Sequence, residues 1–353
     1  MKPSQMEHII IYRNEAEFCS WPFNAGMWRA GSDEIVVGFM NIACDYSYPA
    51  QLSHRRVETF GNISAVRSTD GGRTWGERDV VADNNKLNEE LQYAPPAKYE
   101  TPGDFTNPDT LLACWSTPNS GEPDIKAWIK RSEDGGRSWG PAVLLPDCGI
   151  PRYQGRPSYV VREDGTILLF LTAQPETDPH DRPVVFSSKD GGCDWALHSY
   201  MPGSSLYRVI CPSPALLPDG TILTAVRCKP SMTSAFNELY ASDDGGLTWR
   251  FMNRINEQGD TCDLIRLQDG RLFIVYGYRR PPFGIRAKIS EDNGQTWGPE
   301  LVLRDDGGSL DLGYPRCLQL ADGTIVASYY FNDADTSRPT GGTRYIGGTL
   351  LRV

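Results

Sequence analysis

STDGGRTW at Ser68–Trp75 is the first of five copies of one phrase in this chain. The others are SEDGGRSW at Ser132–Trp139, SKDGGCDW at Ser188–Trp195, SDDGGLTW at Ser242–Trp249 and SEDNGQTW at Ser290–Trp297. Their aspartates (Asp70, Asp134, Asp190, Asp244 and Asp292) are 64, 56, 54 and 48 residues apart. A repeat of about this period indicates one supersecondary unit per copy, as in solenoids and propellers. The phrase therefore decides the architecture before any catalytic residue is considered.

Each copy combines turn-forming residues with a terminal aromatic residue. Asp followed by Gly-Gly or Asn-Gly suits a hairpin turn, because these residues tolerate positive φ. The Asp carboxylate can accept N–H bonds within its own turn, and the Trp ring can pack on the flank of a sheet. We therefore expect the five aspartates to fold the chain and to take no part in chemistry.

A second repeated feature is an Asp-Gly turn between two apolar runs. Such turns lie at Asp164-Gly165, Asp219-Gly220, Asp269-Gly270 and Asp322-Gly323, with weaker versions at 32–34 and 107–109. Asp-Gly between β-rich runs is a strong hairpin signal. Six inner hairpins predict six blades. Five of them each have an inner strand, two further strands, one copy of the repeated phrase and an outer strand.

The last blade needs an outer strand from elsewhere. The chain ends with one more apolar strand at Thr343–Val353, whereas the strand EHIIIYR at Glu7–Arg13 precedes the first blade without a partner of its own. That strand can complete the last blade, which removes exposed sheet edges. The sequence predicts an all-β fold, a single six-bladed β-propeller domain over residues 1–353 whose two termini meet in one blade.

Composition argues against several classes of protein. The net charge is −10 with a pI near 5.0 and no basic cluster, which argues against nucleic acid as a partner. No apolar run is long enough for a membrane, and the first residues hold no apolar signal core. Nine scattered cysteines without metal-like spacing are typical of free thiols in a reducing compartment. We expect a cytoplasmic protein without cofactor or metal; a signal peptide already removed stays open, as does the oligomeric state.

Polar residues gather where the predicted inner strands begin, at one mouth of the central channel. They include Trp21, Asp104, Arg156, Arg208, Asp263 and Arg316. Arginine recognises carboxylates through paired hydrogen bonds, and concave sites with convergent polar groups are the default ligand sites. We expect a carbohydrate there. For any one residue, a salt bridge between blades is the alternative.

The repeated phrase resembles the Asp box of the sialidase superfamily, and the repeats cover almost the whole chain. The resemblance implies a tyrosine nucleophile nine residues before a turn glycine in the last blade, where Tyr314 precedes Gly323. It implies a carboxylate-binding arginine seven residues after a turn glycine in blade four, where Arg227 follows Gly220. A further arginine belongs before the last Asp box, and the candidates are Arg279, Arg280 and Arg286.

Two positions depart from the family pattern. The Arg-Ile-Pro motif of the first blade is absent, and Asn24 stands roughly where its arginine belongs. The carboxylate that activates the tyrosine belongs nine residues before Gly220, where this chain has Cys211. The candidate replacements are Arg156, Arg208 or Arg316 for the arginine and Asp260 or Asp263 for the carboxylate.

The family takes its acid/base aspartate from the loop before the third strand of blade one. In this chain the loop is a long insertion, Asn41–Thr59, which we expect to be structureless, and such insertions are usually functional. Its acid/base candidates are Asp45, His54 and Glu58. Histidine titrates near neutral pH, so His54 can act as acid or base, unless it only pairs with Asp45 or Glu58 at the surface.

Three functions are compatible with these residues. The first is an exo-acting glycoside hydrolase on a glycan that contains an acidic sugar. The second is a polysaccharide lyase, or a glycosidase driven by His54 and Tyr314, on a uronate- or rhamnose-containing glycan. The third is a propeller that binds glycans without catalysis, since a fold does not determine a function.

Overall fold

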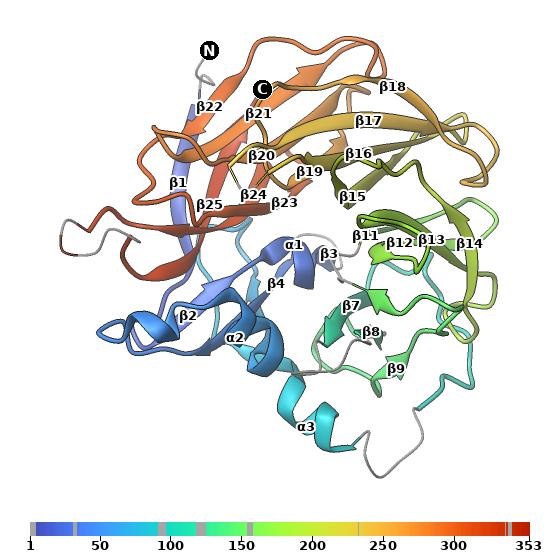
Figure 1. Ribbon diagram of the computed structural model, residues 1–353, viewed down its shortest axis with the longest axis horizontal. Helices are drawn as coiled ribbons and strands as arrows, with labels where there is room; N and C mark the ends of the chain where they lie inside the picture. Colours follow the sequence, from blue (N-terminus) through green and yellow to red (C-terminus); the bar gives the residue numbers. More distant parts are fainter. Residues whose placement is uncertain are drawn as a thin grey trace.

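The chain folds into six antiparallel sheets around a common axis (Figure 1). The computed structural model describes residues 5–30, 34–90, 97–117, 125–153, 158–231, 233–335, 337 and 341–353. Within each sheet, consecutive strands lead outward from the axis to the rim. This arrangement is a six-bladed β-propeller, and it confirms the predicted all-β fold class.

The first three blades are the less regular ones. Blade one holds β2 (Glu17–Ser20), β3 (Met27–Ala30), β4 (Glu34–Ala43), β5 (Asn62–Ser68) and β6 (Asp79–Asp83). Blade two holds β7 (Leu111–Thr117), β8 (Lys126–Ser132) and β9 (Val143–Leu144). Blade three holds β10 (Arg152–Tyr153), β11 (Ser158–Val161), β12 (Ile167–Gln174), β13 (Arg182–Ser188) and β14 (Ala196–Tyr200).

The last three blades have four strands each. Blade four holds β15 (Arg208–Leu216), β16 (Ile222–Lys229), β17 (Phe236–Ser242) and β18 (Arg250–Arg254). Blade five holds β19 (Cys262–Arg266), β20 (Leu272–Tyr278), β21 (Gly284–Ser290) and β22 (Leu301–Arg304). Blade six holds β23 (Gly313–Gln319), β24 (Ile325–Asn332), β25 (Arg344–Arg352) and β1 (Gln5–Tyr12).

The N-terminal strand closes the ring, as the sequence predicts. β1 pairs antiparallel with β25, with Met6 opposite Leu351 and Ile10 opposite Gly347. In Figure 1 the blue β1 lies beside the red β25. The last blade is thereby built from both ends of the chain, and β25 has no free edge.

Four short helical segments decorate the sheets. α1 (Pro22–Ala25) interrupts the inner strand of blade one, and α3 (Asn84–Glu90) follows β6. The 3-10 helix η1 (Pro49–Gln51) and the helix α2 (His54–Phe60) fill the insertion between β4 and β5. The expectation of a structureless insertion is therefore wrong, because its second half forms a helix that ends at Phe60 and is capped by Gly61.

The five Asp boxes share one set of hydrogen bonds. In the first box, Ser68 Oγ donates to Asp70 Oδ1 at 2.8 Å and accepts from the Gly72 N–H at 2.9 Å. Asp70 also accepts from the N–H and the hydroxyl of Thr74, at 2.9 and 2.6 Å. These bonds are internal to the turn, as expected for residues that fold the chain.

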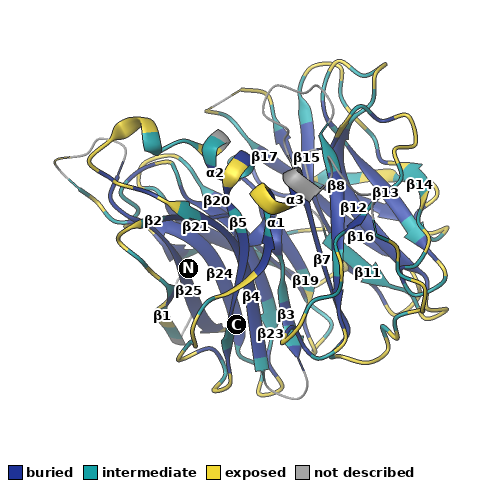
Figure 2. Cartoon of the chain, turned by 90° about the horizontal axis from the view of Figure 1, so that it is seen from below, coloured by how far each residue is buried: buried dark blue, intermediate teal, exposed yellow. Residues whose placement is uncertain are grey.

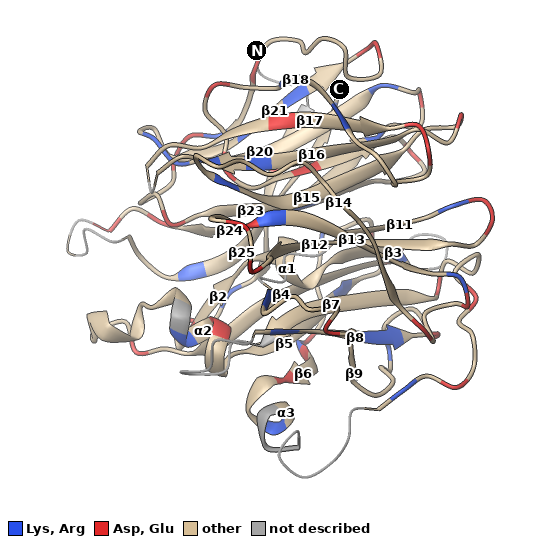
Figure 3. Cartoon of the chain, turned by 45° about the vertical axis from the view of Figure 1, so that its right-hand side comes forward, with Lys and Arg blue, Asp and Glu red and all other residues tan. Residues whose placement is uncertain are grey.

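The core lies between neighbouring blades. The second strands β12, β16, β20 and β24 are buried along almost their whole length, since each sheet packs on both faces. Figure 2 shows these strands in dark blue inside the molecule, with exposed turns at its ends. Figure 3 shows basic and acidic residues interspersed around the molecule rather than gathered by sign.

Blade two departs from the prediction of an inner strand that starts at Glu100–Asp104. Among the described residues its sheet has three strands, and the segment from Thr101 to Thr110 consists of turns. Gly103 N–H bonds to the Gly191 carbonyl of the third Asp box at 3.0 Å. Because strands alternate in direction, the Asp boxes lie at the end opposite the mouth. Asp104 is therefore not a mouth residue: the Pro, Gly and Asp of this segment favour turns over a strand, and Asp104 caps its own turn by accepting from the Thr106 N–H.

Candidate active site

Three residues at the mouth have a left-handed backbone although none of them is glycine. Trp21, Cys211 and Tyr314 have φ of 51°, 56° and 49°, and each precedes a proline. At the latter two, a register shift interrupts the pairing of the inner strands β15 and β23. Such conformations cost about 1–3 kcal/mol each and gather at functional sites. These three strained residues indicate that the inner-strand starts of blades one, four and six belong to one functional site.

Tyr314 lies beside two arginines that share a carboxylate. Arg227 donates from Nη1 to the Tyr314 hydroxyl oxygen at 3.2 Å and from Nη2 to Asp260 Oδ2. Arg279 Nε lies 3.5 Å from Asp260 Oδ1, and its guanidinium donates to the Leu312 carbonyl at 2.8 and 3.0 Å. We call Arg227, Arg279 and Asp260 the arginine cluster.

The arginine cluster carries excess positive charge. Arg227 is 1% exposed and Asp260 5%. Burial alone raises the pKa of Asp260, but Arg227 and Arg279 outweigh it and hold this pKa below the usual value. Asp260 is therefore ionised, and one carboxylate between two guanidinium groups leaves one positive charge beside Tyr314. An anionic ligand with two acceptor oxygens suits that position.

Cys211 lies next to the arginine cluster. Its side chain is fully buried, and Sγ lies 3.4 Å from Thr261 Oγ1, which Arg227 Nη1 also reaches at 3.4 Å. The position where the resemblance implies an activating glutamate thus holds a thiol next to the arginine cluster. Asp260, one of the two candidate replacements for that glutamate, binds both arginines.

A second polar group is centred on Asp311, just before β23. Its Oδ1 lies 2.6 Å from His54 Nε2, at the start of α2, and accepts the Tyr330 hydroxyl at 2.8 Å. Arg344 Nε donates to Oδ2 at 2.9 Å. Burial alone raises the pKa of Asp311, but His54 and Arg344 outweigh it and hold this pKa well below the usual value. An ionised Asp311 therefore fixes the orientation of the His54 imidazole.

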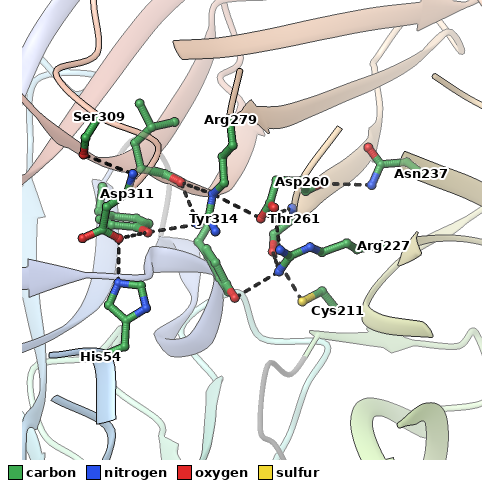
Figure 4. A network of polar contacts seen from close by, with 12 residues as sticks. His54, Cys211, Arg227, Asn237, Asp260, Thr261, Arg279, Ser309, Asp311 and Tyr314 are labelled. Carbon is green, nitrogen blue, oxygen red and sulfur yellow. Dashed lines mark hydrogen bonds and ion pairs between the residues drawn. The ribbon is translucent and has the colours of Figure 1, made fainter. Parts of the chain in front are cut away.

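Aromatic residues join the two polar groups. The Trp21 ring lies edge-on to His54 at 5.1 Å and 5.9 Å from the Tyr314 ring. The Tyr330 ring lies 6.1 Å from the Tyr314 ring, and Arg279 donates to its hydroxyl at 3.0 Å. Figure 4 shows Tyr314 between His54 on one side and Arg227 on the other. Five candidates from the sequence thus lie in one site: Tyr314, His54, Arg227, Arg279 and Trp21.

Other candidates lie around this site in different settings. Asp45 is exposed and caps its own turn, where it accepts from the N–H and hydroxyl of Ser47 at 2.9 and 2.6 Å. Glu58 is half-buried on α2, one helical turn after His54. Arg280 is exposed beside Arg279, and Arg208 pairs with Asp181 at the start of β15. Arg156 lies outside the described residues.

Arg316 and Asp263 bind each other inside the channel. Arg316 Nη1 donates to Asp263 Oδ1 and to Ser158 Oγ, both at 3.0 Å. Asp263 also accepts from Ser213 Oγ at 2.7 Å. This is the salt bridge between blades that the sequence left open as the alternative. Arg316 also lines a cavity of about 400 Å³ between blades one to three, away from Tyr314.

Sequence reasoning places Asp311 at the polar start of the last inner strand but does not pair it with His54, and it misses Tyr330 and Arg344 as site residues. The contact between His54 and Asp311 joins positions 257 residues apart, so no local pattern links them. One signal is present in the sequence. The dipeptides Trp-Pro, Cys-Pro and Tyr-Pro at 21, 211 and 314 mark the three strained starts, and Asp311 stands three residues before the last of them.

Comparisons with known proteins agree with the fold. The BNR repeat-like domain family matches residues 109–262. A sialidase of Micromonospora viridifaciens is 28% identical over 222 residues, which is 50% of this chain and 31% of the relative. A sialidase of Bacteroides fragilis is 24% identical over 309 residues, 76% of this chain and 54% of the relative. The chain therefore spans between about a third and about half of these relatives.

Solved structures share the whole architecture. A Dyadobacter fermentans protein of unknown function has a TM-score of 0.77 at 25% identity, covering 98% of both chains. An α-L-arabinanase of Penicillium chrysogenum, solved with arabinobiose, has a TM-score of 0.67 at 12% identity, covering 98% of this chain and 97% of the other. The latter likeness shows the fold alone.

Proposed function

Because this chain belongs to the sialidase superfamily of six-bladed propellers, which includes glycoside hydrolases, we propose that it is an exo-acting glycoside hydrolase for glycans with a terminal acidic sugar. The observation that carries this proposal is the arginine cluster beside Tyr314. Two guanidinium groups, the buried Arg227 and the half-buried Arg279, with one carboxylate between them favour a carboxylate on the ligand. Tyr314 is only 6% exposed, which favours the end of a glycan over its middle.

In this proposal, the arginine cluster orients the sugar and Tyr314 attacks its anomeric carbon. A phenol is neutral, so it approaches an acidic sugar without the repulsion that a carboxylate nucleophile meets. As the bond between the phenol oxygen and the anomeric carbon forms and the bond to the leaving oxygen breaks, the phenol proton passes to solvent. Arg227 donates to the phenol oxygen and stabilises the phenolate character that loss of this proton creates. Tyr314 then leaves when water hydrolyses the glycosyl–tyrosine bond, which gives retention of the anomeric configuration.

His54 is the proposed acid and base. Asp311 holds Nε2, and Figure 4 shows the second ring nitrogen on the side of Tyr314. That nitrogen can donate a proton to the leaving oxygen in the first step and take one from water in the second. The pair works as a unit, since ionised Asp311 orients the ring and stabilises the imidazolium.

Leaving-group dependence tests this assignment. On natural acidic disaccharides, Tyr314→Phe and His54→Asn are each expected to lower kcat at least a hundredfold. On an aryl glycoside, whose leaving group needs no proton, His54→Asn recovers most of its kcat/KM, which reports the first step, whereas its kcat stays low because the second step still lacks the base. Tyr314→Phe recovers neither. Tyr48→Phe is the matched control, because Tyr48 is 60% exposed on the neighbouring loop. Equal losses for His54→Asn on both substrates would contradict the acid role.

The Tyr314–His54 pair also suits a lyase, and Cys211 is the observation that favours this second function. With a thiol where the family has a glutamate, one of Tyr314 and His54 can instead remove the proton at C5 of a uronate whose carboxylate the arginine cluster neutralises, while the other protonates the oxygen that leaves C4, so that a C4–C5 double bond forms. Ultraviolet absorbance of an unsaturated product would identify the lyase. Binding of acidic glycans without turnover would leave a binding propeller.

A further inference from the structure

Lys229 is a half-buried lysine at the edge of the arginine cluster. It is the last residue of β16, two positions after Arg227, and residues two apart in a strand share a face. Its backbone is paired with Arg208 of β15. Within the part of the chain that the structure describes, its ammonium has neither a hydrogen-bond partner nor an ion-pair partner. A half-buried cation without a partner is unfavourable unless an anion arrives.

The groups that face Lys229 come from four elements. Arg208 on β15 is its cross-strand neighbour and Arg227 precedes it on β16, and the charges of Asp260 before β19 and Arg279 after β20 also act on its pKa. Arg208 is itself paired with Asp181. Burial, and next the charge of Arg227, lowers the pKa of Lys229 to about 8. Four cations here face two carboxylates, Asp181 and Asp260, so the region carries two positive charges in excess.

A single substrate carboxylate balances only one of those charges. A small cleft beside the cluster is lined by Asp260, Arg279, Arg280 and the 233–235 connection after β16. We propose that Lys229 is a specificity-determining residue that binds a second anionic group of the substrate, a sulfate ester or a second carboxylate, next to the carboxylate held by Arg227 and Arg279. The inference rests on one part of the proposed function, that an acidic sugar binds at the arginine cluster. It does not depend on whether the protein hydrolyses that sugar.

Binding of inorganic sulfate, measured by titration calorimetry, tests Lys229 independently of turnover. We expect Lys229→Met to weaken sulfate binding about tenfold, as the loss of one charge-assisted contact predicts, whereas Lys229→Arg retains it. The control is Lys189→Met, which removes the same charge from an exposed lysine in the third Asp box, at the opposite end of the propeller. Equal binding by Lys229→Met and the wild type would overturn the inference.

Matched glycans then identify the second anion. One acidic disaccharide is compared in three forms: unmodified, sulfated and with a second carboxylate. We expect wild type to prefer one modified form about tenfold in dissociation constant, and Lys229→Met to lose that preference. The preference also fades as pH rises through about 8, where lysine loses its charge, and persists in Lys229→Arg.

The outcomes separate this inference from the proposed function. Loss of preference without any turnover sustains Lys229 and contradicts the hydrolase. Turnover with no preference among the three forms contradicts Lys229 and leaves the hydrolase intact. A preference that Lys229→Met preserves contradicts Lys229 as its source.

Discussion

At the scale of single residues, the site depends on two carboxylates that hold cations in place. Asp260 joins Arg227 and Arg279, and Asp311 joins His54 and Arg344. Asp260 is buried and Asp311 is partly buried, and both are kept ionised by their partners. Both carboxylates position side chains around Tyr314: Asp260 holds Arg227 and Arg279, and Asp311 holds the imidazole of His54.

Asp311→Asn tests the positioning of His54. The amide keeps the shape but not the charge, so the imidazolium loses its partner, and kcat is expected to fall about a hundredfold or more. Arg344, 2% exposed, loses its counter-charge too, which costs about 3–5 kcal/mol when a buried pair is broken. The control is Asp45→Asn, in the same region but exposed. If both variants leave kcat unchanged while Asp311→Asn lowers the melting temperature, Asp311 is only structural.

At the scale of elements, the Asp boxes are near copies of one turn with one defect. Four of them have Thr or Ser four residues after the Asp, with a hydroxyl that donates to Asp Oδ2. The third box has Asp194 there, which contributes only its N–H. The defect adds a negative charge next to Asp190.

Asp194→Thr is therefore expected to stabilise the protein. It restores the hydroxyl donor and removes a like charge, for a gain of about 0.5–1.5 kcal/mol in the free energy of unfolding. The check is the denaturation midpoint of Asp194→Thr against that of Asp194→Ala, which removes the charge without a donor. If Asp194→Ala gains as much as Asp194→Thr, charge repulsion alone explains the effect.

The boxes also predict loss of stability in acid. The hydrogen bonds from Thr74 and Thr296 lower the pKa of Asp70 and of Asp292 to about 2. A lowered aspartate pKa stabilises the fold above its unfolded value near 4, and this contribution is lost as pH falls towards 2. Unfolding midpoints between pH 2 and 5 measure it. In Asp70→Asn the slope over that window is expected to be shallower, and an unchanged slope would contradict the assignment.

At the scale of the whole molecule, ring closure by β1 is what makes the last blade complete. Deleting residues 1–12 removes β1 and exposes the edge of β25. Exposed edges recruit other strands, so we expect aggregation and a lower melting temperature. Deleting residues 1–4 leaves β1 intact and serves as the control. Scattering and thermal melts compare the two, and a monomeric, equally stable 1–12 deletion would refute closure as a stabilising element.

Most of the fold is predictable from this sequence because its signals are local. The Asp boxes and Asp-Gly turns specify each hairpin within a few residues. The resemblance to sialidases, counted from those turns, then points to Tyr314 and Arg227. The predictions of an inner strand in blade two and of a mouth position for Asp104 are wrong. The alternating pattern of a strand is absent there, and Pro, Gly and Asp favour turns instead. Asp311 is out of reach because its contact with His54 depends on the closed ring.

Trapping the covalent intermediate tests the central claim most directly. An acidic glycosyl fluoride with a second fluorine on the ring forms the glycosyl–enzyme bond faster than water breaks it. We predict, by mass spectrometry, one adduct on the peptide that contains Tyr314, absent in Tyr314→Phe. Turnover of acidic glycosides with no adduct on Tyr314, or with an adduct on another residue, would contradict the account.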